Sequence, residues 1–320
     1  MSGIVDFGIG YPGGQVSVAG MHAASGVPAA DILKITHAAR FPALDEDELS
    51  WQMALRAARE VLYRNTVDPA DIRYVVYAGS GEWDVPFWSP AAKVAHGLGI
   101  EWAHCFEVSN FCNGGMTALK IAGDKLELRG TGHALVLVAD QLSRMVDYSD
   151  PQSKALFNFG DAAAAVLVAP GSRGPFVLLH SAMRTDPGWS DYYAGEHQEG
   201  RVLIRRGAHR KGLAEAYVRN FTALIEDTLA ALGRKLSEVS YLLINQGDRD
   251  MHERLLRELD FPEEKSVFNY SRLGHMGGAD TLIALQQLRV QGLLKPGDLL
   301  LLATSAMGFT WGITALEFQG

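Results

Sequence analysis

Residues 107–116 of this 320-residue chain read Glu107-Val108-Ser109-Asn110-Phe111-Cys112-Asn113-Gly114-Gly115-Met116. The pattern predicts a strand that turns directly into a helix, which continues through Thr117. A cysteine at such a turn lies beside unpaired backbone N–H groups and the positive end of the helix dipole, and both favour the thiolate. Cys112 is therefore a candidate nucleophile. The alternative is a buried structural cysteine, which is the commoner state of a free cysteine.

The same order of features recurs in the second half of the chain. Residues 268–278 form a turn that enters a predicted helix over 279–291, and a strand follows. This order repeats that of residues 106–139, and Gly277-Gly278 corresponds to Gly114-Gly115. The chain therefore predicts an internal duplication. Two such strand-and-helix units suit a layered α/β fold with a pseudo-twofold axis.

The strongest boundary signal is the proline- and glycine-rich segment 170–175. We expect an N-terminal half over 1–170 and a C-terminal half over 171–320. Under the pseudo-twofold symmetry, His275 lies at a turn that corresponds to the turn of Cys112. The two side chains are therefore expected to face each other across the junction of the halves.

Composition excludes several classes of protein. The formal net charge of −8 argues against a general nucleic-acid binder. Two cysteines supply neither a disulfide framework nor a zinc cluster, and the ten histidines show no metal-site spacing. The chain has no signal-peptide pattern and no apolar run of membrane-spanning length. We expect a soluble, cytoplasmic protein without a metal.

Three further segments carry predictions. The acidic residues 45–48 are expected to start an amphipathic helix. The segment from about 184 to 212 is expected to be an irregular surface loop, and its basic residues favour a solvated face over a phosphate site. In the loop 81–90, Trp83, Phe87 and Trp88 either line a substrate pocket or serve as core or dimer contacts, and the sequence leaves both readings open.

Nearly end to end, the chain resembles the thiolase-fold condensing enzymes, specifically the β-ketoacyl-acyl-carrier-protein synthase III group and its acyltransferase relatives. The resemblance is carried by residues 108–115, by Phe159-Gly160-Asp161 with the small residues after it, and by the closing segment 308–312. It implies two duplicated halves in a five-layered α-β-α-β-α arrangement. It also implies a homodimer, without a permanently bound cofactor, that uses acyl-coenzyme A (acyl-CoA) or acyl-carrier protein as acyl donor.

In that family the cysteine accepts an acyl group, and a histidine and an asparagine assist decarboxylation of a malonyl thioester. This chain has Asn245 where the family's histidine is expected and His275 where its asparagine is expected. The resemblance therefore implies a Cys112, His275 and Asn245 set with two positions exchanged. Met307 stands in the family's run of glycines, where its N–H is expected to complete an oxyanion hole with that of Cys112. Phe309 is an expected substrate-binding residue.

The exchange favours an acyltransferase that passes the acyl group of Cys112 to a second substrate, in secondary or lipid metabolism. The first alternative is a decarboxylative β-ketoacyl synthase III. The second is a non-catalytic partner subunit of a condensing-enzyme pair. The acidic residues of Asp248-Arg249-Asp250, near the expected donor entrance, would repel an acidic carrier protein.

Overall fold

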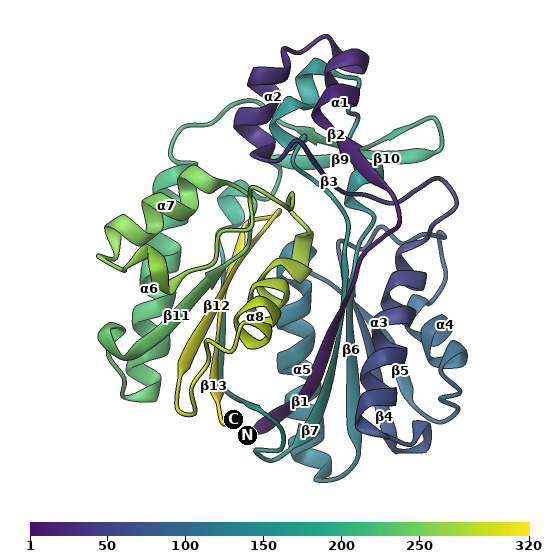
Figure 1. Ribbon diagram of the computed structural model, residues 1–320, viewed down its shortest axis with the longest axis vertical. Coiled ribbons are helices and arrows are strands. Elements are labelled where there is room, and N and C mark those ends of the chain that lie inside the picture. Colours follow the sequence, from purple (N-terminus) through teal and green to yellow (C-terminus); the bar gives the residue numbers. More distant parts are fainter.

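The computed structural model describes residues 1–320, whose main strands form one mixed sheet in the order β11-β12-β13-β8-β1-β7-β6-β4-β5. β1 and β8 join its two sides, pairing only between residues 2–4 and 176–178. Beyond this short contact the two sides diverge, and helices α5 and α8 lie between them (Figure 1).

The first half supplies five strands and three helices to the layered core. The strands are β1 (Ser2–Gly10), β4 (Ile72–Gly79), β5 (His104–Ser109), β6 (His133–Ala139) and β7 (Ala163–Pro170). The helices are α3 (Ser50–Asn65), α4 (Pro90–Gly97) and α5 (Gly114–Arg129). A smaller part over residues 15–42 contains β2 (Gln15–Ser17), α1 (Val18–Ser25), α2 (Ala29–Thr36) and β3 (Arg40–Pro42).

The second half repeats this arrangement with one strand fewer. Its sheet strands are β8 (Phe176–Thr185), β11 (Val239–Ile244), β12 (Leu299–Ala306) and β13 (Thr310–Phe318). Its helices are α6 (Leu213–Leu232), α7 (Arg249–Glu258) and α8 (Asp280–Val290). The order β11-β12-β13-β8 matches β4-β6-β7-β1, and no strand corresponds to β5. The predicted duplication is confirmed, although the sequence did not predict α7.

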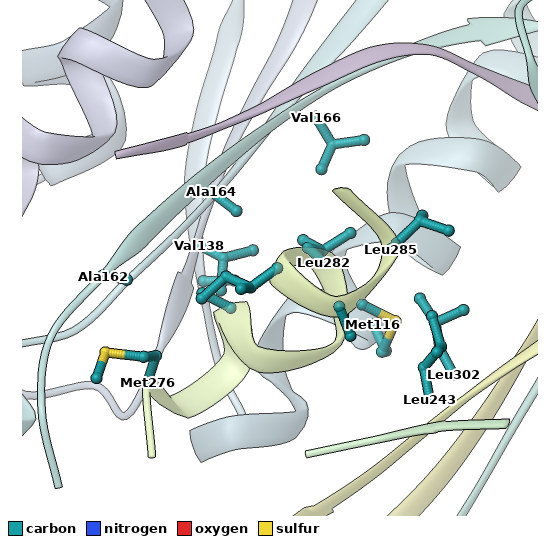
Figure 2. Close-up of a cluster of buried hydrophobic side chains, with 14 of the residues drawn as sticks. Met116, Val138, Ala162, Ala164, Val166, Leu243, Met276, Leu282, Leu285 and Leu302 are labelled. Atoms are coloured by element: carbon teal, nitrogen blue, oxygen red, sulfur yellow. The ribbon is translucent and has the colours of Figure 1, made fainter. Parts of the chain in front are cut away.

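Three hydrophobic clusters separate five layers. The largest surrounds α5 and α8 and includes Met116, Val138, Leu282 and Leu302, which come from both helices and both sides of the sheet (Figure 2). A second lies between α3 and α4 and the first side of the sheet, and a third between α6 and α7 and the second side. The expected α-β-α-β-α arrangement is therefore present.

Glycines let the two central turns approach each other. Short 3-10 turns, η2 (Phe111–Asn113) and η8 (Gly277–Ala279), precede α5 and α8. A Cβ on Gly278 would lie 2.9 Å from Val138 Cγ1 and 3.2 Å from the Cys112 carbonyl oxygen. A side chain there would push the turns apart, so the glycine positions the Cys112 turn against the turn that follows His275.

The predicted start of the first amphipathic helix is wrong. Helix α3 begins at Ser50, because the carboxylate of Asp84 accepts hydrogen bonds from the backbone N–H groups of Ser50 (2.7 Å) and Trp51 (3.0 Å). Glu48 instead accepts a hydrogen bond from Gly13 N–H at 2.9 Å. The acidic segment therefore binds a neighbouring loop through Glu48, and Asp84, from a distant loop, caps the helix.

The predicted irregular loop is also wrong in part, since it contains a hairpin of β9 (Tyr193–Gln198) and β10 (Arg201–Arg206). Within it, Arg205 pairs with Asp150 at 2.9 Å and with Glu196 at 2.8 Å. The residue pattern of this segment predicted a loop and did not reveal the two strands, which pair with each other and lie outside the main sheet.

No helix of the chain combines the length and the apolar character that a membrane span requires.

Candidate active site

A sharp turn presents Cys112 at the start of α5. β5 ends at Ser109, and Phe111 adopts a φ of 48°, a left-handed conformation that few residues other than glycine adopt. Cys112 follows directly, with only 6% of its surface exposed. Backbone strain of this kind gathers at functional sites, so the turn supports Cys112 as a candidate nucleophile.

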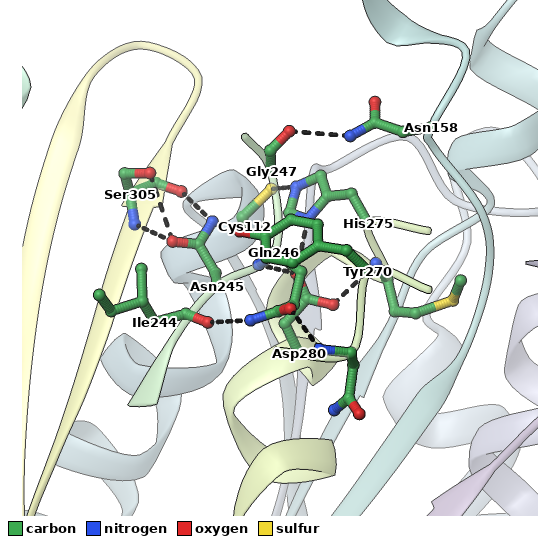
Figure 3. A network of polar contacts seen from close by, with 12 residues as sticks. Cys112, Asn158, Ile244, Asn245, Gln246, Gly247, Tyr270, His275, Asp280 and Ser305 are labelled. Carbon is green, nitrogen blue, oxygen red and sulfur yellow. Dashed lines mark hydrogen bonds and ion pairs between the residues drawn. The ribbon is translucent and has the colours of Figure 1, made fainter. Parts of the chain in front are cut away.

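His275 and Asp280 extend from Cys112 as a chain of hydrogen bonds. Cys112 Sγ lies 3.2 Å from His275 Nε2, and His275 Nδ1 lies 2.6 Å from Asp280 Oδ2 (Figure 3). All three side chains are buried. A nucleophile, a base and a carboxylate that orients the base are the parts of an activated-nucleophile site.

The surroundings of Asp280 fix the histidine's proton. Asp280 Oδ2 also accepts a hydrogen bond from Gln246 N–H at 2.6 Å, and Oδ1 accepts one from Met276 N–H at 2.9 Å. A carboxylate held in this way keeps a proton on His275 Nδ1. His275 Nε2 is then the nitrogen that exchanges a proton at Cys112.

The pKa of His275 is raised well above its ordinary value. Burial lowers the pKa, but the negative charges of Cys112 and Asp280, together with hydrogen bonds to both, outweigh the effect of burial. This balance favours a protonated imidazole ring at His275, next to Cys112 Sγ.

Asn245 is fixed in orientation by Ser305. Its Oδ1 accepts a hydrogen bond from Ser305 N–H at 3.0 Å, and its Nδ2 donates to the Ser305 carbonyl oxygen at 3.1 Å. An amide clamped from both sides cannot flip, so Nδ2 keeps its second hydrogen for another partner. The exchanged pair expected from the sequence thus lies beside Cys112 in space (Figure 3).

The loop before β7 holds the second half of the site. The carbonyl oxygen of Asn158 accepts a hydrogen bond from His275 N–H at 2.6 Å, and Asn158 Nδ2 donates to the Gly247 carbonyl oxygen at 2.8 Å. The ring of Phe159 packs edge-on against His275, with centroids 5.0 Å apart. First-half residues therefore position both loops that carry the candidate residues of the second half.

Two cavities meet at Cys112. The smaller, of about 220 Å³, is mostly apolar and includes Leu142 and Val202 in its wall. The larger, of about 690 Å³, contains Asn245 and His275. Four residues line both cavities: Cys112, Phe159, Tyr193 and Met307. The sulfur therefore lies where an apolar group from one side and a polar reaction partner from the other can meet.

Met307 lies at this junction, and Phe309 lines the larger cavity. The N–H of Met307 donates no hydrogen bond within the protein, so it is available to a ligand, as an oxyanion donor requires. Phe309 lines the larger cavity and stacks on Tyr193 with ring centroids 6.1 Å apart. The sequence suggested a role at the substrate for both residues, and both line the larger cavity together with Cys112.

The aromatic loop residues lie elsewhere. Trp83 packs against Tyr77 at 5.3 Å and Trp88 against Trp51 at 6.3 Å, while Phe87 projects into solvent. None of these three loop residues lines either cavity at Cys112. Of the two readings that the sequence left open, these contacts favour core packing for both tryptophans.

Asp280 and Ser305 are not among the candidate residues that the sequence suggested. Asp280 is the first residue of α8 and the fifth after His275, where an acidic residue reads as a partner of the helix dipole. Ser305 acts through its backbone, which leaves no signature in residue type. Elsewhere, no group of three or more His, Cys, Asp or Glu side chains could hold a metal ion.

Comparison with known proteins assigns this arrangement to a family. Residues 106–187 match the family model described as 3-oxoacyl-[acyl-carrier-protein (ACP)] synthase III, and residues 229–318 match its C-terminal counterpart. The chain is 31% identical over 288 residues to the β-ketoacyl-[acyl-carrier-protein] synthase III of Lactobacillus delbrueckii subsp. bulgaricus, covering 85% of this chain and 84% of that protein. The chain belongs to the β-ketoacyl-[acyl-carrier-protein] synthase III family.

Further relatives of the synthase III family agree over most of the chain. The Bradyrhizobium diazoefficiens synthase is 30% identical over 285 residues, covering 83% of each protein. The crystal structure of the Aquifex aeolicus synthase superposes with a TM-score of 0.87 at 26% identity, covering 99% of this chain and 100% of that one. Synthase III proteins transfer acyl groups, so the chain is an acyl-transferring enzyme.

Proposed function

We propose that Cys112 accepts an acyl group from the thioester of acyl-CoA or acyl-carrier protein and passes it to a second substrate. The Cys112–His275–Asp280 chain of hydrogen bonds carries this proposal. In the first half-reaction the Cys112 thiolate attacks the thioester carbonyl, and His275 Nε2 protonates the leaving thiolate of the donor. The N–H groups of Cys112 and Met307 are the proposed donors to the oxyanion. The acyl chain would occupy the smaller, apolar cavity.

The same contacts favour transfer over decarboxylative condensation. In the acyl-enzyme, Cys112 Sγ is neutral, and neutral His275 keeps its proton on Nδ1 beside Asp280. Its Nε2 then has a lone pair and acts as a base toward the second substrate. Decarboxylation of a malonyl thioester instead requires hydrogen-bond donors to the thioester carbonyl oxygen. Asn245 Nδ2 supplies one such hydrogen, whereas His275 Nε2 in this state supplies none. Decarboxylative condensation stays the alternative.

The donor, the assembly and the location are parts of the same proposal. A polar basin of about 990 Å³ beside the larger cavity contains Arg206 and Arg249 as well as Asp248 and Asp250, and this mixed charge suits a CoA donor better than an acidic carrier protein. No permanently bound cofactor is needed for the proposed chemistry.

We propose a homodimer, since β5 leaves an unpaired edge of the sheet beside the exposed Trp102. Two free cysteines fit a cytoplasmic location.

Incubation with a panel of acyl-CoA donors tests the proposed first half-reaction. Mass spectrometry of peptides is expected to find the added acyl mass on the peptide that contains Cys112. Cys112→Ala should abolish the adduct, and Cys105→Ala should retain it. If neither acyl-CoA nor acyl-carrier-protein donors produce an adduct, the proposal fails.

Carbon dioxide release separates the alternatives. With malonyl-CoA added to the acyl-enzyme, we expect little or no release, whereas rapid release would establish condensation. The partner-subunit alternative predicts that Cys112→Ala leaves the output of the pathway unchanged, and the proposed acyl transfer predicts that the variant abolishes it.

A further inference from the structure

Gly247 leaves an open space where two nitrogen atoms of the site meet. It lines the larger cavity together with Cys112, Asn245 and His275. A Cβ built on Gly247 would lie 4.0 Å from Asn245 Nδ2 and 4.0 Å from both Nε2 and Cε1 of His275, and apart from the adjoining residues 246 and 248 no residue comes nearer. Both nitrogens therefore border the part of the larger cavity in front of Gly247.

The hydrogen-bonding capacity of the two nitrogens differs. Ser305 fixes the amide of Asn245 and uses one of the two hydrogens on Nδ2, so one hydrogen is left. His275 Nδ1 is engaged by Asp280, and Nε2 is free to accept a proton once Cys112 Sγ carries an acyl group. The space is thus bordered by one donor and one base.

We propose that this space is the subsite of the acyl acceptor and that it selects a hydroxyl group. This inference rests on the proposed acyl transfer. One lone pair of the hydroxyl oxygen accepts the hydrogen bond from Asn245 Nδ2, and another attacks the thioester carbon. The O–H proton passes to His275 Nε2. A C–O bond forms, the C–S bond breaks, and Cys112 regains its thiolate beside the imidazolium, with an ester as product.

An amine does not satisfy this arrangement. A neutral amine has one lone pair, and the hydrogen bond from Asn245 Nδ2 would occupy the pair that must attack. A protonated amine has none. The donor at Asn245 is therefore the feature that distinguishes the two classes of acceptor, and Gly247 provides the room.

Gly247→Ala tests the position of the subsite. The added methyl group meets its neighbours at ordinary contact distances, and the φ of Gly247 lies outside the left-handed region, so the variant is expected to fold. The methyl group would fill the space of the hydroxyl. Loading of Cys112 by acyl-CoA should stay within about threefold of wild type, whereas transfer to methanol should fall roughly 10- to 100-fold, because the acceptor is misplaced. Gly13→Ala is the matched control: its nearest contact would be 3.6 Å, and Gly13 lines neither cavity at Cys112.

Methanol and methylamine, which are similar in size, test the class of acceptor. Each is added to preloaded acyl-enzyme, and each rate is divided by the rate with the free S-acyl-N-acetylcysteamine thioester. We expect the wild-type enzyme to accelerate methanolysis at least about tenfold more than aminolysis, as the single lone pair of an amine requires. Equal acceleration would overturn the hydroxyl assignment. Normal transfer by Gly247→Ala, or loss of loading in that variant, would overturn the subsite. A wild-type enzyme that loads no acyl group would overturn the proposed function itself.

Discussion

At the scale of single residues, Asp280 joins the three parts of the candidate site. It accepts hydrogen bonds from His275 Nδ1, from the loop after β11 through Gln246 N–H, and from Met276 N–H. One carboxylate therefore sets the tautomer of His275, contributes to its raised pKa, and fixes the loop that carries Asn245.

Asp280→Asn is expected to lower the rate of Cys112 acylation by about 10²- to 10⁴-fold. The amide is nearly the same size but carries no charge, so the pKa of His275 falls and the imidazolium facing Cys112 is less populated near neutral pH. Alkylation of Cys112 by iodoacetamide at pH 7 should slow in parallel. Asp260→Asn, a change at an exposed position in the same half, serves as control. Unchanged alkylation and acylation in Asp280→Asn would rule out the role assigned to this carboxylate.

At the scale of secondary-structure elements, a residue from a distant loop sets where helix α3 starts. The N-cap of α3 is Leu49, whose side chain cannot accept a hydrogen bond from the helix. Asp84, in the loop after β4, replaces that function by accepting from the backbone N–H of Ser50 and Trp51 and from the hydroxyl of Ser50. The loop 81–90 therefore contributes to the stability of α3.

Asp84→Ala is expected to lower the free energy of unfolding by about 1–2 kcal/mol, the usual loss for a removed helix cap. Asp47→Ala, in the acidic segment just before the helix, should leave stability unchanged. Denaturant titration followed by circular dichroism measures both variants. If Asp47→Ala were the destabilising change, the acidic segment would be the cap after all.

At the scale of the whole molecule, Asp6 connects the two halves. This buried carboxylate on β1 accepts hydrogen bonds from Arg64 (2.8 Å) and Asn65 (2.8 Å) of the first half and from Arg289 (2.8 Å) on α8 of the second. Burial raises the pKa of Asp6, but the hydrogen bonds from Arg289, Asn65 and Arg64 together lower it by more than burial raises it. The pKa of Asp6 therefore lies below its ordinary value of 3.8.

Asp6→Asn is expected to lower the free energy of unfolding at pH 7 by on the order of 2 kcal/mol. Because the folded-state pKa is depressed, the contribution of the carboxylate is present above about pH 4 and is lost as the pH falls through the folded-state pKa. The difference between wild type and variant should therefore shrink below pH 4. Thermal unfolding measured from pH 3 to 7 checks this, and a difference independent of pH would contradict the assignment.

Local pattern was sufficient for much of the fold. The turn around Cys112, its repeat around His275, and most of the long helices and sheet strands of both halves follow from apolar periodicity and glycine placement, which act within about ten residues. Pattern failed for two features, one set by a distant residue and one that is a local hairpin. The start of α3 depends on Asp84, and the β9–β10 strands of the predicted loop pair only with each other.

By itself, the sequence determined the duplicated α/β fold, the family, and the proximity of Cys112 to His275, which are 163 positions apart. Only the tertiary structure revealed that Asp280 orients His275, that the backbone of Ser305 fixes Asn245, and that Trp83, Phe87 and Trp88 lie away from the cavities. His275 and Asp280 are only five positions apart, but an acidic residue at a helix start does not by itself reveal a contact with the imidazole. The other features depend on hydrogen bonds and packing between loops that are distant in the chain. No local periodicity encodes such contacts, because they form only when the layered core has brought the loops together.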